Sequence, residues 1–363
     1  MTPEQRAALT AKDYSDCSLI MLDQPECWQS QTKSEEQLQE LRDRGLWLSQ
    51  LQRMSLDDKI TYSIKIIEQA LKQLPKEKWA ISFSGGKDSS ILSHLMVETL
   101  NLDIPHVMSN TRQEYPDVIR VASRRFAALR ARGILAEYAL PDVQPGDLWV
   151  DGGIPLWGKE ASTKFIQFSR TGNPNHLKQV SPFLQEQFHK ALAAGIKVTD
   201  RCCGFLKKKP LKKWDRAHGI KGHFTGVRAS ESQARRLAAI QRGFLYDSTR
   251  NSQWISNPLG CWVEADVWDY LDRFDMRKLF PMGKTGSGCI GCLYGFHLVG
   301  EEPNAMQMLW VTDRRRWAIA KDDWGYGEAA RVLDIPLVPS EAQIELIRQR
   351  FRDGESSDSD ELT

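Results

Sequence analysis

The stretch Trp79–Leu95, WAISFSGGKDSSILSHL, decides the fold that we expect for this chain. It opens with a short β-branched and aromatic run that is typical of a strand. It closes with apolar residues at helical spacing, Ile91, Leu92 and Leu95. Residues 84–89 therefore join a strand to a helix, and the turn between them lies at a helix N-terminus.

The chemistry of this turn predicts a phosphate-binding site. Gly85 and Gly86 allow backbone N–H groups to approach an anion, the helix dipole favours negative charge, and Lys87 supplies a compact cation. An ordinary strand–turn–helix connection would also use glycine, but it has no reason to add lysine, aspartate and hydroxyl groups. The spacing is not that of the Walker loop, G-x-x-x-x-G-K-[ST].

Composition indicates a soluble globular protein. The chain has 363 residues, of which 41% are hydrophobic and 26% are charged. Its net charge of +2 results from 49 basic and 47 acidic residues, so attraction to a polyanion must come from local patches. The sequence contains no apolar run long enough to span a bilayer, and its start resembles neither a signal peptide nor a transit peptide. We expect a cytoplasmic location.

Four of the seven cysteines form the strongest metal signal. Cys202 and Cys203 are adjacent, and Cys289 and Cys292 form a C-x-x-C. Four thiolates suit an iron–sulfur cluster or a structural zinc ion. Because all-cysteine zinc sites usually combine two C-x-x-C pairs, the adjacent pair favours a [4Fe-4S] cluster. Zinc, or thiols without a metal, remain the alternatives.

The motif SGGKDS resembles the PP-loop of the adenine nucleotide alpha hydrolase-like superfamily, whose members bind ATP or an adenylyl nucleotide and cleave between the α and β phosphates. Three further segments resemble the phosphoadenosine phosphosulfate reductase-like family: PHVMSNTRQEYPDVI, FTGVRASESQARR and NPLGCWVEADVWDYL. Together they cover about residues 75–300. The resemblance implies an α/β fold with an open, mostly parallel twisted sheet and helices on both faces.

The same resemblance implies a set of site residues. It assigns catalytic roles to Lys87, Asp88 and Arg228, and nucleotide binding to Ser84, Gly85, Gly86, Lys87, Asp88, Ser89, Ser90, Asn110, Thr111, Gly226, Arg228 and Arg235. At the second loop the family more often has Asp-Thr-Gly, where this chain has Asn110, Thr111 and Arg112.

The residues alone support a role for Arg228 as an anion clamp. It follows a short strand, and ligands usually lie at the carboxyl ends of strands in open parallel sheets. For Asp88 two roles are open: it orients a Mg²⁺ ion or the waters of that ion, or it caps the helix.

The cysteine pattern is similar to that of cluster-binding sulfonucleotide reductases and of the cluster-containing ATP pyrophosphatases of DNA phosphorothioation systems. It strengthens the expectation of a [4Fe-4S] cluster on Cys202, Cys203, Cys289 and Cys292. The basic stretch KKKPLKK, residues 207–213, is open to three interpretations: a solubilising surface loop, a phosphate contact, or a nucleic-acid contact. Arg314–Arg316 near Trp317 are a weaker nucleic-acid signal, because these tryptophans suit a core equally well.

The function that we predict is an ATP pyrophosphatase that adenylates a substrate for sulfur incorporation. DNA phosphorothioation is the expected setting, with ATP and Mg²⁺ as cofactors and a cysteine desulfurase or another sulfur-donor protein as partner. The resembling reductases carry a nucleophilic cysteine near the C-terminus, whereas here no cysteine follows Cys292, so a reductase would need Cys17, Cys27 or Cys261. The alternatives are a sulfonucleotide reductase, a tRNA thiolation enzyme, and a non-catalytic nucleotide-binding regulator.

We expect four segments along the chain. Residues 1–74 form a helical extension with helices within 34–54 and 55–74. Residues 75–300 form the PP-loop domain, and residues 301–350 are helical. The acidic end, residues 351–363, lacks the apolar residues needed for packing and is expected to be disordered.

Overall fold

The computed structural model describes residues 34–178, 180–248, 253–280, 289–298 and 300–355, with side chains up to residue 349. The chain divides into two compact units. Unit 1 comprises residues 1–108, 120–138 and 214–279, and unit 2 comprises residues 109–119, 139–213 and 280–363. Cys17, Cys27 and residues 356–363 lie outside the described residues, and the four segments expected along the chain stay a prediction.

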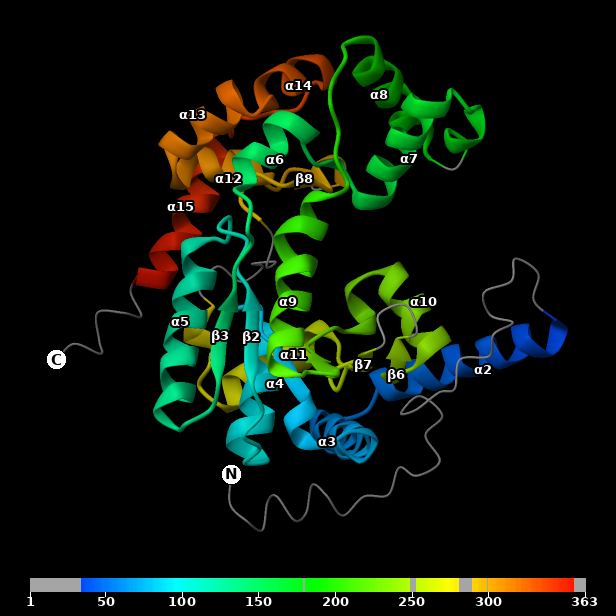
Figure 1. Ribbon diagram of the computed structural model, residues 1–363, viewed down its shortest axis with the longest axis vertical. Helices are drawn as coiled ribbons and strands as arrows, with labels where there is room; N and C mark the ends of the chain where they lie inside the picture. Colours follow the sequence, from blue (N-terminus) through cyan, green and yellow to red (C-terminus); the bar gives the residue numbers. More distant parts are fainter. Residues whose placement is uncertain (1–33, 179, 249–252, 281–288, 299, 356–363) are drawn as a thin grey trace. The chain divides into compact units, whose positions relative to one another are not determined.

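Unit 1 is built on a sheet that has six strands within the described residues. Their order is β3-β2-β1-β5-β7-β6 (Figure 1). Strand β1 pairs in parallel with β2 and β5, β5 pairs in parallel with β7, and β6 forms an antiparallel edge. The expected open, mostly parallel sheet is confirmed. The strands are β1 Trp79–Ser82, β2 His106–Ser109, β3 Ala136–Ala139, β5 Gly222–Thr225, β6 Leu245–Ser248 and β7 Gln253–Ser256.

The centre of this sheet is apolar and closely packed. Trp79, Ala80 and Ile81 have no exposed surface, as expected for a strand covered on both faces. The Trp79 ring lies 4.5 Å from the Phe224 ring and extends over Gly222 of the neighbouring strand. A Cβ atom on Gly222 would meet the indole at 2.5 Å, so the tryptophan requires glycine beside it.

Helices pack on both faces of the sheet. Phe126 of α5 contacts Phe83 and Tyr138. Glu137 is adjacent to Tyr138 in β3 and so points to the opposite face, where it accepts a hydrogen bond from the Trp214 indole of α9. The helices that contribute to unit 1 are α2 Glu35–Gln52, α3 Leu56–Gln73, α4 Lys87–His94, α5 Pro116–Ala131, α9 Lys209–His218, α10 Gln233–Arg242 and α11 Glu264–Arg273.

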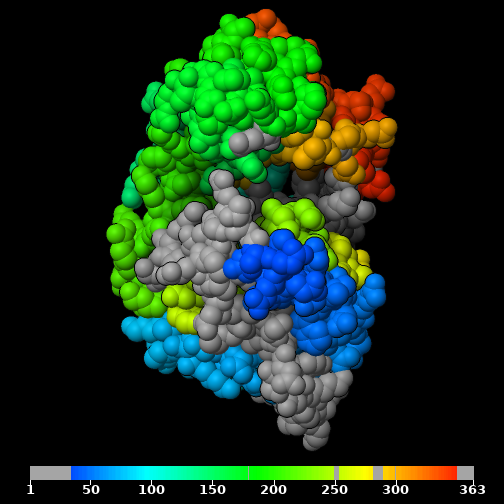
Figure 2. Space-filling view, turned by 90° about the vertical axis from the view of Figure 1, so that its right-hand side faces the viewer, coloured from blue at the N-terminus to red at the C-terminus, as the bar shows by residue number. Residues whose placement is uncertain are grey.

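The two helices expected before the first strand are confirmed as α2 and α3. Ser34 begins α2 with a capping box shared with Gln37, and Ser55 begins α3 by accepting a hydrogen bond from the Asp58 N–H. Helix α2, in dark blue, lies at the surface in the space-filling view (Figure 2).

The basic stretch 207–213 is helical, so its interpretation as a surface loop is wrong. A π-helical turn, Gly204–Lys208, leads directly into α9. Pro210 closely follows this π-helical turn, and such turns are places where the regular helical hydrogen-bond pattern is interrupted. The helix is anchored further along by Asp215, which lies 2.9 Å from the His223 ring nitrogen.

Unit 2 packs helices around a short parallel pair of strands, β4 Leu156–Trp157 and β8 Leu293–Tyr294. Its core is rich in aromatic side chains, and the Trp157 ring lies 4.9 Å from the Phe188 ring. Trp317 packs against this core and donates to the Leu337 carbonyl, which supports its interpretation as a core residue. The helices are α6 Pro145–Gly152, α7 Lys159–Thr171, α8 Pro182–Ala193, α12 Ala305–Thr312, α13 Arg314–Asp323, α14 Tyr326–Leu333 and α15 Glu341–Glu355.

The expected helical region beyond residue 300 is confirmed, although α15 continues to Glu355 and so passes the boundary expected at residue 350. Across the described parts of both units, no helix has the length and hydrophobicity that crossing a membrane would require.

Buried His106 makes the stability of unit 1 sensitive to acid. Its ring contacts the Ser93 hydroxyl and the Ile104 carbonyl, and burial together with the nearby Arg125 charge lowers its pKa to about 3. Above pH 6.5 the imidazole is neutral in both the folded and unfolded chain. As the pH falls below 6.5, the unfolded chain binds a proton that the folded chain excludes, so stability is lost.

We expect this group to remove roughly 3 kcal/mol from the free energy of unfolding between pH 6.5 and pH 4. Urea unfolding at several pH values measures how the free energy of unfolding depends on pH, and His106→Asn should weaken this dependence. The exposed His189→Asn is the matched control for loss of a histidine. A pH dependence that His106→Asn leaves unchanged would contradict this assignment.

Candidate functional site

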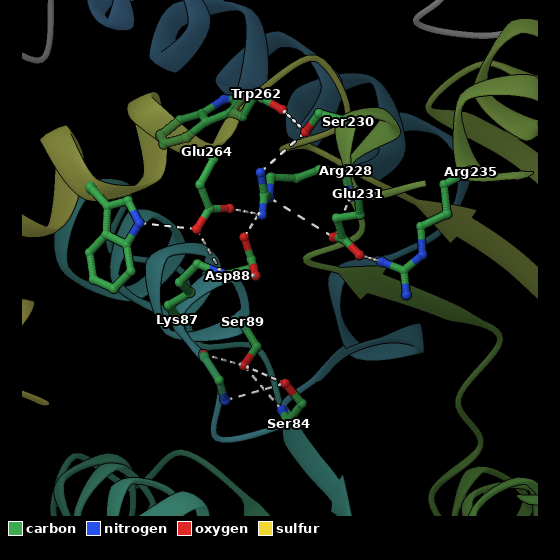
Figure 3. A network of polar contacts seen from close by, with 12 residues as sticks. Ser84, Lys87, Asp88, Ser89, Arg228, Ser230, Glu231, Arg235, Trp262 and Glu264 are labelled. Carbon is green, nitrogen blue, oxygen red and sulfur yellow. Dashed lines mark hydrogen bonds and ion pairs between the residues drawn. The ribbon is translucent and has the colours of Figure 1, made fainter. Parts of the chain in front are cut away.

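The turn between β1 and α4 is closed by its own hydrogen bonds (Figure 3). Gly85 has a φ of 72°, and Gly86 is the residue before the first helical residue, Lys87. The Ser84 N–H donates to the Ser89 hydroxyl, which donates in turn to the Gly86 carbonyl at 2.9 Å. The left-handed conformation at Gly85 explains why glycine is needed there.

The serine hydroxyls of the turn differ in their hydrogen bonding. The hydroxyls of Ser84 and Ser89 bond inside the turn, so we assign them first to its shape. The Ser90 hydroxyl is buried and has no hydrogen-bond partner among the described residues. Because the N–H groups of the first helical turn lack intrahelical acceptors, this end of α4 favours anions.

Gly226, directly after β5, allows a second strand end to approach this turn. A Cβ atom at Gly226 would lie 2.9 Å from the Asp88 carbonyl carbon and 3.0 Å from the Ser89 nitrogen. The backbone after β5 therefore touches the start of α4, and glycine is required by this close approach.

Arg228 is held at this junction by two carboxylates (Figure 3). Its side chain is 4% exposed; Nε donates to Asp88 at 2.6 Å, and Nη2 donates to Glu264 at 2.7 Å. A buried guanidinium must be paired, so Asp88 is first of all an ion partner of Arg228. Asp88 does not cap α4, because Gly86 occupies the capping position. Its proposed contact with Mg²⁺ stays a prediction.

Glu264 joins the two expected cations. Its carboxylate lies 3.3 Å from the Lys87 ammonium, bonds Arg228, and accepts from the Trp268 indole N–H at 3.0 Å. Partial burial tends to raise its pKa, but the hydrogen bond from Arg228 and the charges of Lys87 and Arg228 hold the pKa below its usual range. Sequence reasoning did not single out Glu264, whose only signal was its place at a helix start.

The arginines after Arg228 have different surroundings. Arg235 is ion-paired with Glu231, whose other oxygen accepts from the Arg228 backbone N–H. Arg236 instead bonds Gln52 and Ser49 and so attaches α10 to α2. Arg235 therefore belongs to the Arg228 network, whereas Arg236 supports the fold.

The four expected cysteine ligands interact electrostatically within unit 2. A hydrogen bond between Cys202 and Cys203 shifts their pKa values in opposite directions; burial and the charges of Cys289 and Cys292 add to the upward shift at Cys202. That hydrogen bond, together with the charges of nearby lysines, Lys207 first among them, lowers the pKa of Cys203 to about 6. The lowered pKa of Cys203 favours its thiolate form, whereas burial raises the pKa values of Cys289 and Cys292.

A buried polar shell surrounds these thiols. The Thr111 hydroxyl donates to Glu114 and lies 3.5 Å from the Cys289 sulfur. Burial disfavours the charged form of Lys207, but electrostatic interactions with nearby cysteines and Glu114, that with Cys289 first among them, outweigh this effect and raise its pKa. The places of Lys207 and Thr111 here were not foreseen from sequence.

Asn110 and Thr111 were expected to bind nucleotide. Both belong to unit 2, where Thr111 is fully buried beside Cys289 and the Asn110 side chain accepts from the Arg112 N–H. Their contact with a nucleotide stays a prediction.

The donor set is compatible with an anionic iron–sulfur cluster. The buried Tyr326 hydroxyl has no hydrogen-bond partner among the described residues, and burial and the charges of Cys292 and Cys202 raise its pKa. This hydroxyl and the Lys207 ammonium are donors that a negatively charged cluster can use. Among the described residues, no group of three or more His, Cys, Asp or Glu side chains is arranged around a single metal position.

Comparison with known proteins identifies one domain. Residues 171–295 match the family model of the phosphoadenosine phosphosulfate reductase domain. This part of the chain is similar to that family. The matched residues include the four cysteines, Arg228 and Glu264, whereas the turn between β1 and α4 precedes them.

Two curated relatives are reductases. The adenosine 5′-phosphosulfate reductase of Burkholderia cepacia is 24% identical over 178 residues, which are 44% of this chain and 67% of the relative. The phosphoadenosine 5′-phosphosulfate reductase of Xanthomonas axonopodis pv. citri (strain 306) is 22% identical over 247 residues, 67% of this chain and 78% of the relative. A crystal structure of phosphoadenylyl-sulfate reductase from Candida auris, a phosphate complex, is 15% identical, with a TM-score of 0.41 over 72% of this chain and 97% of that one.

The chain is thus a distant homologue of sulfonucleotide reductases. These relatives favour the reductase alternative over the expected ATP pyrophosphatase of DNA phosphorothioation. The likeness to the reductase family is confirmed, while the closer likeness to phosphorothioation enzymes stays a prediction.

Gly226→Ala tests the contact between the end of β5 and α4. The added methyl group meets backbone atoms, which cannot rotate away, so we expect a loss of about 1–3 kcal/mol in the free energy of unfolding, measured with urea. Gly45→Ala in α2 is the control, because its new Cβ would meet Ile240 at an ordinary 3.7 Å and alanine favours helices. Equal stability of Gly226→Ala and the unchanged protein would exclude the close approach.

Proposed function

We propose that this chain reduces a sulfonucleotide, adenosine phosphosulfate or phosphoadenosine phosphosulfate. The observation that carries the proposal is the convergence of Lys87 and Arg228 at the N-terminus of α4, on a chain whose residues 171–295 match the reductase domain model. Two cations beside a helix N-terminus provide the charges that phosphate and sulfate oxygens need.

In the proposed reaction, a cysteine thiolate attacks the sulfur of the bound nucleotide. A sulfur–sulfur bond forms, the bond from sulfur to the phosphate oxygen breaks, and the adenosine phosphate leaves with the electron pair. Lys87, Arg228 and the N–H groups at the start of α4 stabilise the negative charge that builds on the leaving phosphate. A dithiol reductant such as thioredoxin then displaces sulfite from the enzyme thiosulfonate.

The attacking thiolate must be accessible, and this requirement removes one candidate. Cys261 is fully buried, so it does not meet a nucleotide without unfolding its surroundings. Outside the four clustered cysteines, Cys17 and Cys27 remain, and both lie outside the described residues. We therefore assign the attack to one of these two.

The group Cys202, Cys203, Cys289 and Cys292 would hold a [4Fe-4S] cluster. Such a cluster supplies a redox-active or charge-bearing centre. The chain contributes the four thiolates, the Lys207 ammonium that balances their charge, and the Thr111 hydroxyl beside Cys289.

The second candidate is the ATP pyrophosphatase expected from the sequence. The observation that favours it is the SGGKDS turn itself, which lies between β1 and α4 as in the PP-loop that it resembles. The same cations, with Mg²⁺, would neutralise a leaving pyrophosphate while an oxygen of DNA, or alternatively tRNA, takes the adenylyl group. A cysteine desulfurase or similar donor would then deliver sulfur.

The two candidates differ in their product. With adenosine phosphosulfate, phosphoadenosine phosphosulfate and a thioredoxin system, we expect the anaerobic protein to release sulfite, and Cys17→Ser or Cys27→Ser to abolish the release. Pyrophosphate release from ATP, stimulated by DNA or tRNA and without sulfite, would reject the reductase in favour of the second candidate.

Lys87→Ala removes one of the two cations without touching the strand that precedes it. We expect turnover to fall by about 100-fold, because charge stabilisation in the transition state is lost. Lys65→Ala, which removes a lysine paired with Glu68 at the surface, is the control. Unchanged turnover in Lys87→Ala would exclude Lys87 from the reaction.

The cluster is tested by its metal content. Cys202→Ser and Cys289→Ser should each abolish iron and sulfide binding in anaerobically purified protein, because each removes one thiolate ligand. Cys261→Ala, at a buried cysteine outside the group, should retain both. About one zinc per chain without iron would reject the cluster and establish the zinc alternative.

A further inference from the structure

The charges around Arg228 balance one another (Figure 3). Three cationic side chains face three carboxylates, namely Lys87, Arg228 and Arg235 with Asp88, Glu231 and Glu264. An incoming anion therefore meets little net positive charge from this group. To bind both Lys87 and Arg228 directly, an anion must replace one of the carboxylates.

Glu264 is the carboxylate that can leave at least cost. Its side chain is 52% exposed, whereas those of Asp88 and Glu231 are 23% exposed. Asp88 pairs with the Nε of buried Arg228, and its departure would leave that guanidinium poorly compensated. Since the Glu264 carboxylate is itself more than half exposed, water can hydrate it when it leaves its two partners.

The contacts of Glu264 are those that a phosphate or sulfate group would make. One oxygen lies 3.3 Å from the Lys87 ammonium and the other accepts from Arg228 Nη2 at 2.7 Å. A single carboxylate thus bridges an ammonium and a guanidinium, as two oxygens of one phosphate do. Glu264 is the first residue of α11, so rotation of its own side chain is enough to release both cations.

We propose that Glu264 is an internal competitor for the anion site formed by Lys87 and Arg228. Its carboxylate holds the two cations in place before the nucleotide binds, yields them to phosphate or sulfate oxygens, and returns as the product leaves. The proposal rests on the phosphate site of the proposed function and deepens it by naming the residue that sets anion affinity and release.

Loss of Glu264 changes the affinity for anions in opposite directions, depending on whether Glu264 competes with the anion or only positions the two cations. If Glu264 only oriented Lys87 and Arg228, its loss would misplace them and weaken anion binding. If it competes, Glu264→Gln frees both cations, preserves the size of the side chain, and strengthens binding. The two roles are therefore separated by the direction of one measured change.

The experiment measures binding of inorganic pyrophosphate by calorimetry, without divalent metal, to the full chain and to Glu264→Gln. We expect binding to Glu264→Gln to be about fivefold tighter or more, because the anion no longer competes with a charged carboxylate for the two cations. Asp272→Asn is the matched control: it removes the same charge from the same helix, but its partner is Arg277. Its affinity should stay at that of the unchanged protein.

Three results would overturn the proposal: unchanged or weaker binding in Glu264→Gln, equal strengthening in both variants, or no pyrophosphate binding in any of the three proteins. Urea unfolding verifies that each variant is folded. Because the probe needs no turnover, tighter binding in Glu264→Gln together with absent sulfite release would reject the proposed reduction and leave the competitor in place. Normal sulfite release with unchanged pyrophosphate binding in Glu264→Gln would reject the competitor role and leave the proposed reduction in place.

Discussion

The buried ion pair between Arg228 and Asp88 is the constraint on which the candidate site in unit 1 depends. A guanidinium that is 4% exposed is costly unless a carboxylate reaches it, so the residue after Lys87 must face the loop that follows β5. That approach requires the missing side chain of Gly226 and the left-handed turn at Gly85. The hydroxyl of Ser89 bonds the backbone on both sides of the turn and so holds its shape.

Sequence predicted those parts of the fold that local signals determine. The strand before the glycines, the helix after Gly86, and the capped helices α2 and α3 all follow from short-range periodicity and capping residues. The basic stretch was less decidable, because its composition suits a loop. Helix α9 forms there because Trp214 and Asp215 bond distant residues, Glu137 and His223, and a contact of this kind leaves no local pattern.

The cationic side chains of the candidate site could be predicted from the sequence, whereas its carboxylates could not. Lys87 and Arg228 stood out because glycines precede both, whereas Glu264 looked like an ordinary helix-start glutamate. Glu264 gains its role from contacts with Arg228 and Lys87, which lie 36 and 177 positions earlier in the sequence. In unit 2, the contact of Thr111 with Cys289 was not predicted, since a buried hydroxyl takes the partner that the packing supplies, and its expected contact with a nucleotide stays a prediction.

The balance of charge in unit 1 also bears on what kind of protein this is. A regulator that retains a nucleotide gains from cations without competing carboxylates, since affinity is its purpose. An enzyme gains from cations that are already compensated, because tight binding of substrate and product alike does not accelerate the reaction. Lys87 and Arg228 are both paired with carboxylates, one of them more than half exposed. This arrangement favours turnover over retention, and so favours an enzyme over the non-catalytic alternative.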